Sequence, residues 1–460
     1  MKLSAIILAG VLSLLLPAAA LTSAALHAED ATEVMTPEYY SLWNDDVQKQ
    51  IDERIEKYRK ADAHVWITGV KPGSEVKIEM IRHKFLFGAH IFSFDQLGSD
   101  ELNAKYKQTY GTLFNAATVP FYWRSFEREQ GRPRFAAGPE DTAESWNSCP
   151  EPTKHPNWRR PATDPIVDYL ENRGVVMNGH PLVWSNFDDQ VPDWLPADKD
   201  QIERLIDKRI AEIAEHYGDR IARYDVVNES AGQFDLPGRA ANHMPEDYTL
   251  KAFRTADKVF PKKVLFNIND FYVNETYAEQ IKWLLGQGCR IDVVGVQMHL
   301  FNPADIQRIA EGENIETPSI QEARLRAASK GGRPIHLSEI TITAPTDDET
   351  GRAIQAVVAR NLYRYWFSWP TMMGITWWNT VDGCAVAGEP QTSGLFTRQM
   401  EPKPSFYALD QLINHEWKTS ITATAEGSTF DYTFRGFKGT YEVRWTTADD
   451  KPMTMTMKVE

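Results

Sequence analysis

Cysteine is scarce in this chain of 460 residues, which contains only three. Because the number is odd, at most one internal disulfide can form and one thiol is left over. Cys149 and Cys384 fall in predicted loops and are the expected pair, whereas Cys289 precedes an apolar strand and is predicted to be buried. No cysteine and histidine residues have the spacing of a zinc site, so the sequence predicts no metal.

Basic residues are outnumbered by acidic ones, 50 against 64, and the net charge is −14. Nucleic-acid binding depends on basic groups that neutralise phosphates, so this balance argues against a nucleic-acid partner. The chain also lacks a Gly-x-Gly-x-x-Gly run or a phosphate-binding loop after an early strand. Their absence disfavours a doubly wound nucleotide-binding sheet, and we expect no cofactor.

Long apolar runs are confined to the N-terminus. Lys2, the run Ile6–Leu16 and the small residues up to Ala28 have the order of a secretory signal peptide. The run breaks at Pro17, short of the ~20 residues that a membrane-spanning helix needs. We therefore expect residues 1–28 to be a signal peptide, the protein to be secreted or periplasmic, and no membrane partner.

The rest of the chain alternates short apolar strands with helical stretches. Eight strands are predicted, at Phe85–His90, Thr112–Thr118, Val175–Leu182, Tyr224–Glu229, Lys263–Asn269, Ile291–His299, Pro334–Ile340 and Gly374–Trp378. This alternation is typical of a (β/α)8 TIM barrel, an α/β fold, which we place at residues 85–415.

Both ends of the predicted barrel carry extensions. Residues 29–84 contain a predicted helix at Pro37–Ala61, followed by a β-hairpin with its turn at Lys71–Ser74. Residues 416–460 hold alternating runs between Gly and Asp-Asp turns, which predicts a small β-rich C-terminal extension. The irregular segment Gly131–Pro161 is a long loop, and loops of this length in a compact domain are usually functional.

Two of the predicted strands end on a glutamate, Glu229 in one and Glu339 in the other. A carboxylate at the rim of a core is costly, although either residue taken alone could cap a strand or pair with an arginine. Active sites of TIM barrels gather at the C-terminal ends of the strands, so both acids are expected in one cleft. Such a pair is what the hydrolysis of a glycosidic bond requires.

Further polar and aromatic side chains stand at the same strand ends. The candidates for substrate binding are His180, Trp184, Asn228, Asn269, Gln297, His299 and Trp378. Sugar hydroxyls need hydrogen-bonding side chains, and sugar faces stack on aromatic rings. Structural interpretations stay open, because the histidines and tryptophans could belong to the core and Asn269 could shape a turn.

These motifs, in this order, resemble the family 10 glycoside hydrolases, the endo-β-1,4-xylanases of clan A. The matching pieces are His180–Trp184, Asp225–Glu229, Asn269–Phe271, Gly295–His299, Ile335–Glu339, Gly374–Trp378 and Glu401–Tyr407. The resemblance implies Glu229 as acid/base and Glu339 as nucleophile. It also implies a −1 sugar site formed by His180, Trp184, Asn228, Gln297, His299 and Trp378.

The chain departs from that family after the second strand. A Glu-Asn-x-x-Lys-Trp run that grips the −2 and −1 sugars is replaced by Thr118–Trp123, where Tyr122 and Trp123 could stack on sugar or fill space. An Asp common two residues after the nucleophile is Thr341 here. Each lost charge-assisted hydrogen bond is worth about 1.5–3 kcal/mol, so the sugar specificity is less certain than the reaction class.

We expect a monomeric, secreted enzyme that binds a polysaccharide and cleaves internal β-1,4-xylosidic linkages of xylan by double displacement. Two alternatives stay open. One is a hydrolase of the same family that acts on a different β-linked polysaccharide. The other is a barrel that binds carbohydrate without hydrolysing it.

Overall fold

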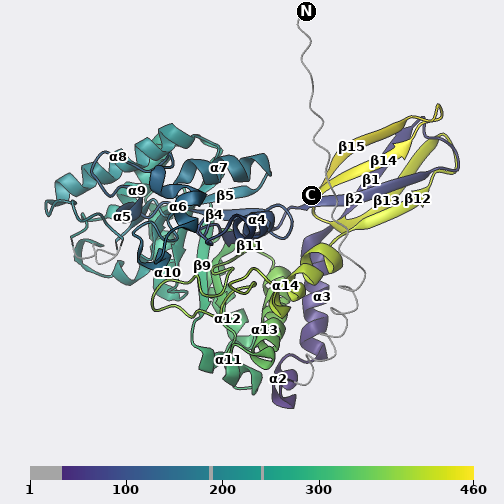
Figure 1. The fold of residues 1–460 in the computed structure, drawn as a ribbon. Helices are drawn as coiled ribbons and strands as arrows, with labels where there is room; N and C mark the ends of the chain where they lie inside the picture. The colour runs from purple at the N-terminus through teal and green to yellow at the C-terminus, as the bar shows by residue number, and fades with distance from the viewer. Residues whose placement is uncertain (1–33, 186–189, 240–242) are drawn as a thin grey trace, which may run out of the picture.

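The computed structural model describes residues 34–185, 190–239 and 243–460. The predicted signal peptide, residues 1–28, lies outside them. Within the described ranges, no helix combines the length and the apolar character that a bilayer crossing requires. A barrel forms the larger part of the molecule, and a smaller β unit projects from one side of it (Figure 1).

Eight parallel strands close the barrel, which confirms the predicted fold class. In chain order they are β3 (Leu86–His90), β4 (Ala116–Pro120), β5 (Val176–His180) with its continuation β6 (Val183–Trp184), β7 (Arg223–Asn228), β8 (Leu265–Asp270), β9 (Val293–Leu300), β10 (Ile335–Ile342) and β11 (Met372–Trp377). The ring closes because β11 pairs with β3, and both β5 and β6 pair with β7. Pro181 separates β5 from β6, since proline has no N–H for the ladder.

Helices cover the outside of the barrel. They are α4 (Asp100–Gln108), α7 (Thr163–Asn172), α8 (Lys199–Tyr217), α9 (Tyr248–Val259), α10 (Glu275–Gly286), α11 (Pro303–Ala310), α12 (Pro318–Ser329), α13 (Glu349–Ser368) and α14 (Pro404–Asp410). The short helices α5 (Trp123–Phe126) and α6 (Ala143–Asn147) belong instead to the segment between β4 and α7. With helices outside and side chains inside, strands such as β7 and β10 are buried along their whole length. This burial explains their continuous apolar runs.

Helix α8 shows how the sequence sets one of these elements. Its start is capped by Asp198, whose side chain accepts the Gln201 N–H, and it ends at Gly218, which has a φ of 55°. Buried isoleucines recur three or four residues apart along one face: Ile202, Ile206, Ile210 and Ile213. This spacing places them on a single stripe that packs on the barrel.

The two predicted extensions combine into one unit, which corrects the expected hairpin. Strand β1 (Lys60–Thr68) pairs with β13 (Thr429–Phe437), not with β2 (Glu75–His83). Strand β2 lies between β12 (Ser420–Thr424) and β14 (Gly439–Thr446), and β15 (Pro452–Val459) forms the edge. Strands from opposite ends of the chain therefore share two sheets (Figure 1).

The predicted N-terminal helix is two helices, α2 (Pro37–Leu42) and α3 (Asp45–Arg59). They separate at Asn44, whose side chain accepts the Val47 N–H and begins α3. The predicted disulfide is also absent, because Cys149, Cys289 and Cys384 are all free. Cys384 is buried in the loop after β11, whereas Cys149 follows α6 and is half-buried, so the two loops do not bring these thiols together.

Candidate active site

A pocket of about 540 Å³ lies at the C-terminal ends of the barrel strands. Eight of the nine predicted site residues line it, namely His180, Trp184, Asn228, Glu229, Gln297, His299, Glu339 and Trp378. They come from β5, β6, β7, β9, β10 and the ends of β7 and β11. Residues that are far apart in the chain are thus brought together at one end of the barrel.

Glu339 projects from β10 and is only 5% exposed. Asn269 Nδ2 donates to its carboxylate at 2.7 Å, and two imidazoles lie beside it, with His299 Nε2 at 3.4 Å and His180 Nε2 at 3.8 Å. A carboxylate oxygen accepts hydrogen bonds, which agrees with the direction of the Asn269 contact. The contacts also fix the direction in which the carboxylate points, which a nucleophile requires.

Asn269 lies beneath the pocket and does not line it, although the sequence suggested a substrate contact. Its Nδ2 also donates to Asn228 Oδ1 at 2.8 Å, and its own Oδ1 accepts from Ser338 Oγ. The residue is fully buried. Asn269 is therefore a positioning residue that connects Glu339 to Asn228.

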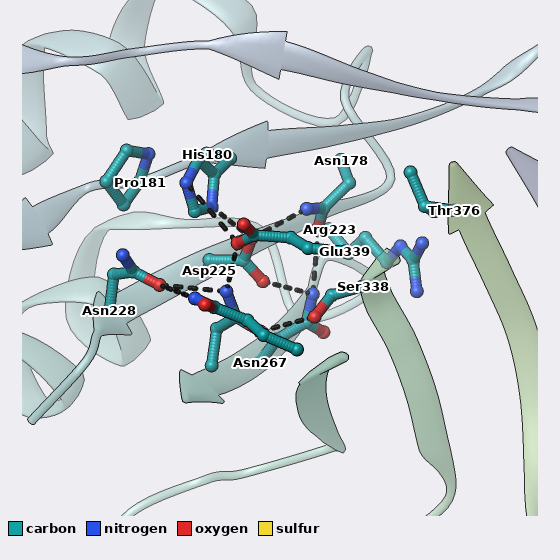
Figure 2. Close-up of polar contacts among 12 residues, drawn as sticks. Asn178, His180, Pro181, Arg223, Asp225, Asn228, Asn267, Ser338, Glu339 and Thr376 are labelled. Carbon is teal, nitrogen blue, oxygen red and sulfur yellow. Dashed lines mark hydrogen bonds and ion pairs between the residues drawn. The ribbon is translucent and has the colours of Figure 1, made fainter. Parts of the chain in front are cut away.

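A second buried layer supports His180 (Figure 2). His180 Nδ1 donates to Asp225 Oδ2 at 2.8 Å, which turns Nε2 toward Glu339. Asp225 also accepts from Asn178 and Asn267, each at 2.9 Å. Burial alone would lower the pKa of His180, but the bond to Asp225 and the charge of Glu339 together raise it.

The predicted site residues did not include Asn178 and Asn267, yet the sequence carried a signal for them. Each stands two residues before a predicted site residue, His180 and Asn269 respectively. Because side chains two apart on a strand share a face, both point into the barrel beneath the site. Two further buried asparagines at that spacing mark a polar layer.

Glu229 follows β7 in the left-handed region, with a φ of 52°. Residues other than glycine rarely adopt this backbone conformation, and such backbone strain concentrates at functional sites. Its N–H donates to the Asn269 carbonyl at 2.8 Å, and its Oε1 accepts from Gln297 Nε2 at 2.9 Å. Burial, followed by the charge of Glu339, raises the pKa of Glu229 from 4.5 to about 7. The two glutamates thus have different environments.

Aromatic rings form one wall of the pocket. Phe92, Tyr122 and Trp378 make a buried cluster with Trp184 packed against it. Phe92 and Trp378 meet edge to face, with ring centroids 5.3 Å apart. Trp123 lies outside the pocket, buried against Glu127, so of the two rings considered for this stretch only Tyr122 faces the site.

Two departures from the expected pattern have structural consequences. His299 Nδ1 contacts Thr341 Oγ1 at 2.9 Å, so a neutral hydroxyl orients the imidazole where an Asp is common. The long loop Gly131–Pro161 reaches the pocket through Arg159 and Arg160. Sequence reasoning predicted a functional loop but not these arginines.

A closed (β/α)8 barrel with two glutamates at strand ends and a polar, aromatic pocket is the arrangement expected of a glycoside hydrolase. The family profile described as "Glycosyl hydrolase family 10" matches residues 80–412, which is most of the chain. The chain therefore belongs to glycosyl hydrolase family 10, as the motifs predicted.

The chain is similar in sequence to several known proteins, at low sequence identity. Endo-1,4-beta-xylanase B of Paenibacillus barcinonensis is 26% identical over 283 residues, 54% of this chain and 80% of that protein. Endo-1,4-beta-xylanase 2 of Claviceps purpurea is 33% identical over 151 residues, and the match spans 45% of its length. Anti-sigma-I factor RsgI6 of Acetivibrio thermocellus is 23% identical over 411 residues, which are 86% of this chain and 46% of that protein.

The structure of native xylanase 10B from Thermotoga maritima superposes with a TM-score of 0.54 and 21% identity. The match covers 72% of this chain and 96% of that one. At this identity the likeness establishes the shared barrel fold. The β unit falls largely outside the family match, because β1 and β12 to β15 lie beyond residues 80–412.

Proposed function

We propose that this chain is an exported, monomeric endo-β-1,4-glycanase that acts with retention, and that xylan is its first candidate substrate. The observation that carries the proposal is the contrast between the two glutamates in one pocket. Glu339 accepts a hydrogen bond from Asn269 and lies beside the imidazoles of His299 and His180, whereas burial raises the pKa of Glu229 to about 7. Double displacement needs one ionised and one protonated carboxyl group.

In the first step Glu229 gives its proton to the glycosidic oxygen while Glu339 attacks the anomeric carbon. The bond to the leaving sugar breaks and a glycosyl ester with Glu339 forms. In the second step the Glu229 carboxylate takes a proton from water, whose oxygen displaces Glu339 from the anomeric carbon. Both glutamates then return to their starting protonation states.

Side chains around the glutamates are suited to hold the reacting sugar. The Asn228 Oδ1 accepts from Asn269 and from Gln297, at 2.8 and 3.4 Å, so its amide N–H groups are available to a sugar hydroxyl. His299 and His180 lie beside the nucleophile, and Trp378 offers a ring face or edge to the sugar. A hydrogen bond to the 2-hydroxyl strengthens as the transition state forms.

Xylan is favoured because two of the relatives above are named endo-1,4-beta-xylanases. Export is supported by the N-terminal order of Lys2, apolar run and small residues. The replaced run Thr118–Trp123 motivates the alternative of another β-linked polysaccharide. The alternative of a barrel that binds carbohydrate without hydrolysing it is decided by the same measurements.

Product analysis with the mature protein decides among these functions. The substrates are xylan, mixed-linkage β-glucan and mannan, and the products are separated by size. We expect xylo-oligosaccharides of several lengths. Release from another polymer but not from xylan would overturn the xylan assignment, and binding without release from any polymer would favour the binding barrel.

A further inference from the structure

The loop between β4 and α7 holds two consecutive arginines against the pocket. Arg159 has a φ of 57°, and its N–H donates to the buried Gln96 Oε1 at 2.7 Å. Gln96 also donates to the Asn157 carbonyl at 3.1 Å. The end of this loop is therefore fastened by buried hydrogen bonds in a conformation that costs free energy, which suggests a functional reason for it.

Arg159 is almost completely buried, at 1% exposure, and only partly satisfied. Its Nη2 donates to His90 Nε2 and Asn379 Oδ1, both at 2.8 Å. Its Nη1 lies 3.5 Å from Glu389, yet neither Nε nor Nη1 has a hydrogen-bond partner within the described residues. Burial, then the charge of Arg159, holds the pKa of His90 well below its usual value, so His90 is neutral and accepts.

Arg160 stacks face-on over an aromatic ring of the pocket wall. Its guanidinium carbon is 3.6 Å from the Tyr122 ring centroid and 5.3 Å from that of Phe92. Its Nη1 donates to the Arg159 carbonyl at 2.9 Å. Throughout the part of the chain that the structure describes, no carboxylate forms an ion pair with Arg160. By contrast Arg324, in the same pocket, is paired with Glu316 through both terminal nitrogens.

We propose that Arg159 and Arg160 form a subsite for the carboxylate of a uronate sugar within the glycan. A guanidinium fixed by stacking presents a planar fork of donors, which matches a carboxylate better than a neutral hydroxyl. The subsite adjoins Tyr122, whose ring belongs to the aromatic wall of the pocket. The inference rests on the proposed function, since it assumes that a β-glycan occupies the pocket.

The acidic side chains of the pocket have other partners, so the guanidinium of Arg160 is available to bind the carboxylate of a ligand. Glu389 lies beside Arg159, and Glu316 pairs with Arg324. Glu229 accepts from Gln297, and Glu339 accepts from Asn269 and lies beside two imidazoles. A second role for Arg160 is to hold Glu339 ionised from across the pocket. If Arg160 had that role, its substitution would shift the pH profile of activity on every substrate. If it binds a carboxylate of the glycan, its substitution would change activity on acidic substrates only.

The test compares glucuronoxylan with the same polymer after its carboxyl groups have been reduced to alcohols. We expect kcat/KM to be about tenfold or more higher on the acidic polymer, the effect of one charge-assisted hydrogen bond. Arg160→Gln should remove this preference by raising KM on the acidic polymer alone, and Arg160→Lys should keep part of it. The matched control is Arg326→Gln, which removes one arginine from the exposed face of α12.

Direct binding separates this inference from the proposed function. Calorimetry with the Glu339→Gln variant measures affinity for both polymers without turnover, and a β-1,4-linked polyglucuronate tests a backbone carboxylate in place of a side group.

If the parent cleaves both xylans equally and binds them equally, the proposed subsite is wrong while the proposed enzymatic function is supported. If no polymer is cleaved, the function fails and the binding preference still decides the subsite. An equal loss on both xylans with a shifted pH profile would assign Arg160 to Glu339 and overturn the subsite.

Discussion

Glu229 and Glu339 are the same chemical group placed in two environments. Glu339 sits in a strand and accepts from Asn269. Glu229 follows a strand in the left-handed region and, among the residues that the structure describes, accepts a side-chain hydrogen bond from Gln297 alone. Local geometry thus separates the roles that the resemblance assigned. The clearest consequences are stereochemical and pH-dependent.

Azide should distinguish the two glutamates by the anomer that forms. Removing the Glu339 carboxylate leaves room for azide on the nucleophile's face, so Glu339→Ala should yield a glycosyl azide of inverted configuration. Glu229→Ala still forms the glycosyl enzyme from an activated aryl glycoside, so azide should give the retained anomer. Each substitution should lower the unrescued rate by about 10²–10⁴-fold or more. NMR of the products reads the anomer, and the reverse pattern would exchange the two assignments.

The alkaline limb of the pH profile should follow Glu229. The first step needs its protonated form, so kcat/KM should fall as pH rises through the pKa of about 7. Gln297 stabilises the carboxylate form by donating to it, so Gln297→Leu should move this limb upward by about 0.5–1 pH unit. Rates measured from pH 4 to 10 test the shift. A downward shift, or a limb that persists in Glu229→Gln with an activated substrate, would contradict the assignment.

The raised pKa of Glu229 also predicts a stability gain on neutralising it. Between pH 4.5 and about 7 the folded state binds a proton that the unfolded state has lost, so stability falls as pH rises through this window. Glu229→Gln should therefore be more stable than the parent by about 1–3 kcal/mol at pH 8 and equal to it at pH 4. Urea unfolding at both pH values measures this. Glu313→Gln is the control, because ion pairing with Arg308 lowers the pKa of Glu313 and gives no such gain.

At the scale of elements, the layer beneath the site ties strands together. Asp225 on β7 accepts from side chains on β5 and β8, and removing it would leave buried donors unpaired. Asp225→Ala should lower the unfolding free energy by about 3–5 kcal/mol. The control Asp305→Ala breaks an exposed pair with Arg308 and should cost about 1 kcal/mol or less. If urea unfolding shows that both substitutions lower the unfolding free energy equally, the layer beneath the site adds no stability.

The barrel strands were predictable because burial on both faces makes them continuous apolar runs. All eight predicted segments contain or overlap an observed strand, although Pro181 divides the third. Polar residues at the strand ends then located the pocket. The role of Asn269 was not predictable, since its contacts with Glu339 and Ser338 depend on the register between strands. Nor could the sequence show that Arg159 and Arg160 turn inward from a long loop.

At the scale of the whole molecule, the β unit joins the two ends of the chain. Its pairing was hidden from the sequence because β1 and β13 come from opposite termini. Aromatic rings connect it to the barrel, where Trp417 stacks on Phe367 of α13 at 4.0 Å and Phe437 lies 6.2 Å from the same ring. No residue of its strands lines the pocket. Its position therefore favours a structural role in holding the ends of the barrel.

Deleting residues 419–460 should therefore destabilise more than the C-terminus. The deletion removes β12 to β15, which leaves β1 without a partner and both edges of β2 open, with Val65, Ile67, Val76 and Ile78 exposed. Unpaired edges beside exposed apolar side chains promote aggregation. We expect the truncated chain to be recovered poorly and to melt earlier than the parent. Co-expression of residues 419–460 as a separate chain should restore both properties, because β13 and β14 can pair again with β1 and β2. A truncated chain that melts at the parent's temperature and keeps full activity would show that the barrel needs neither sheet.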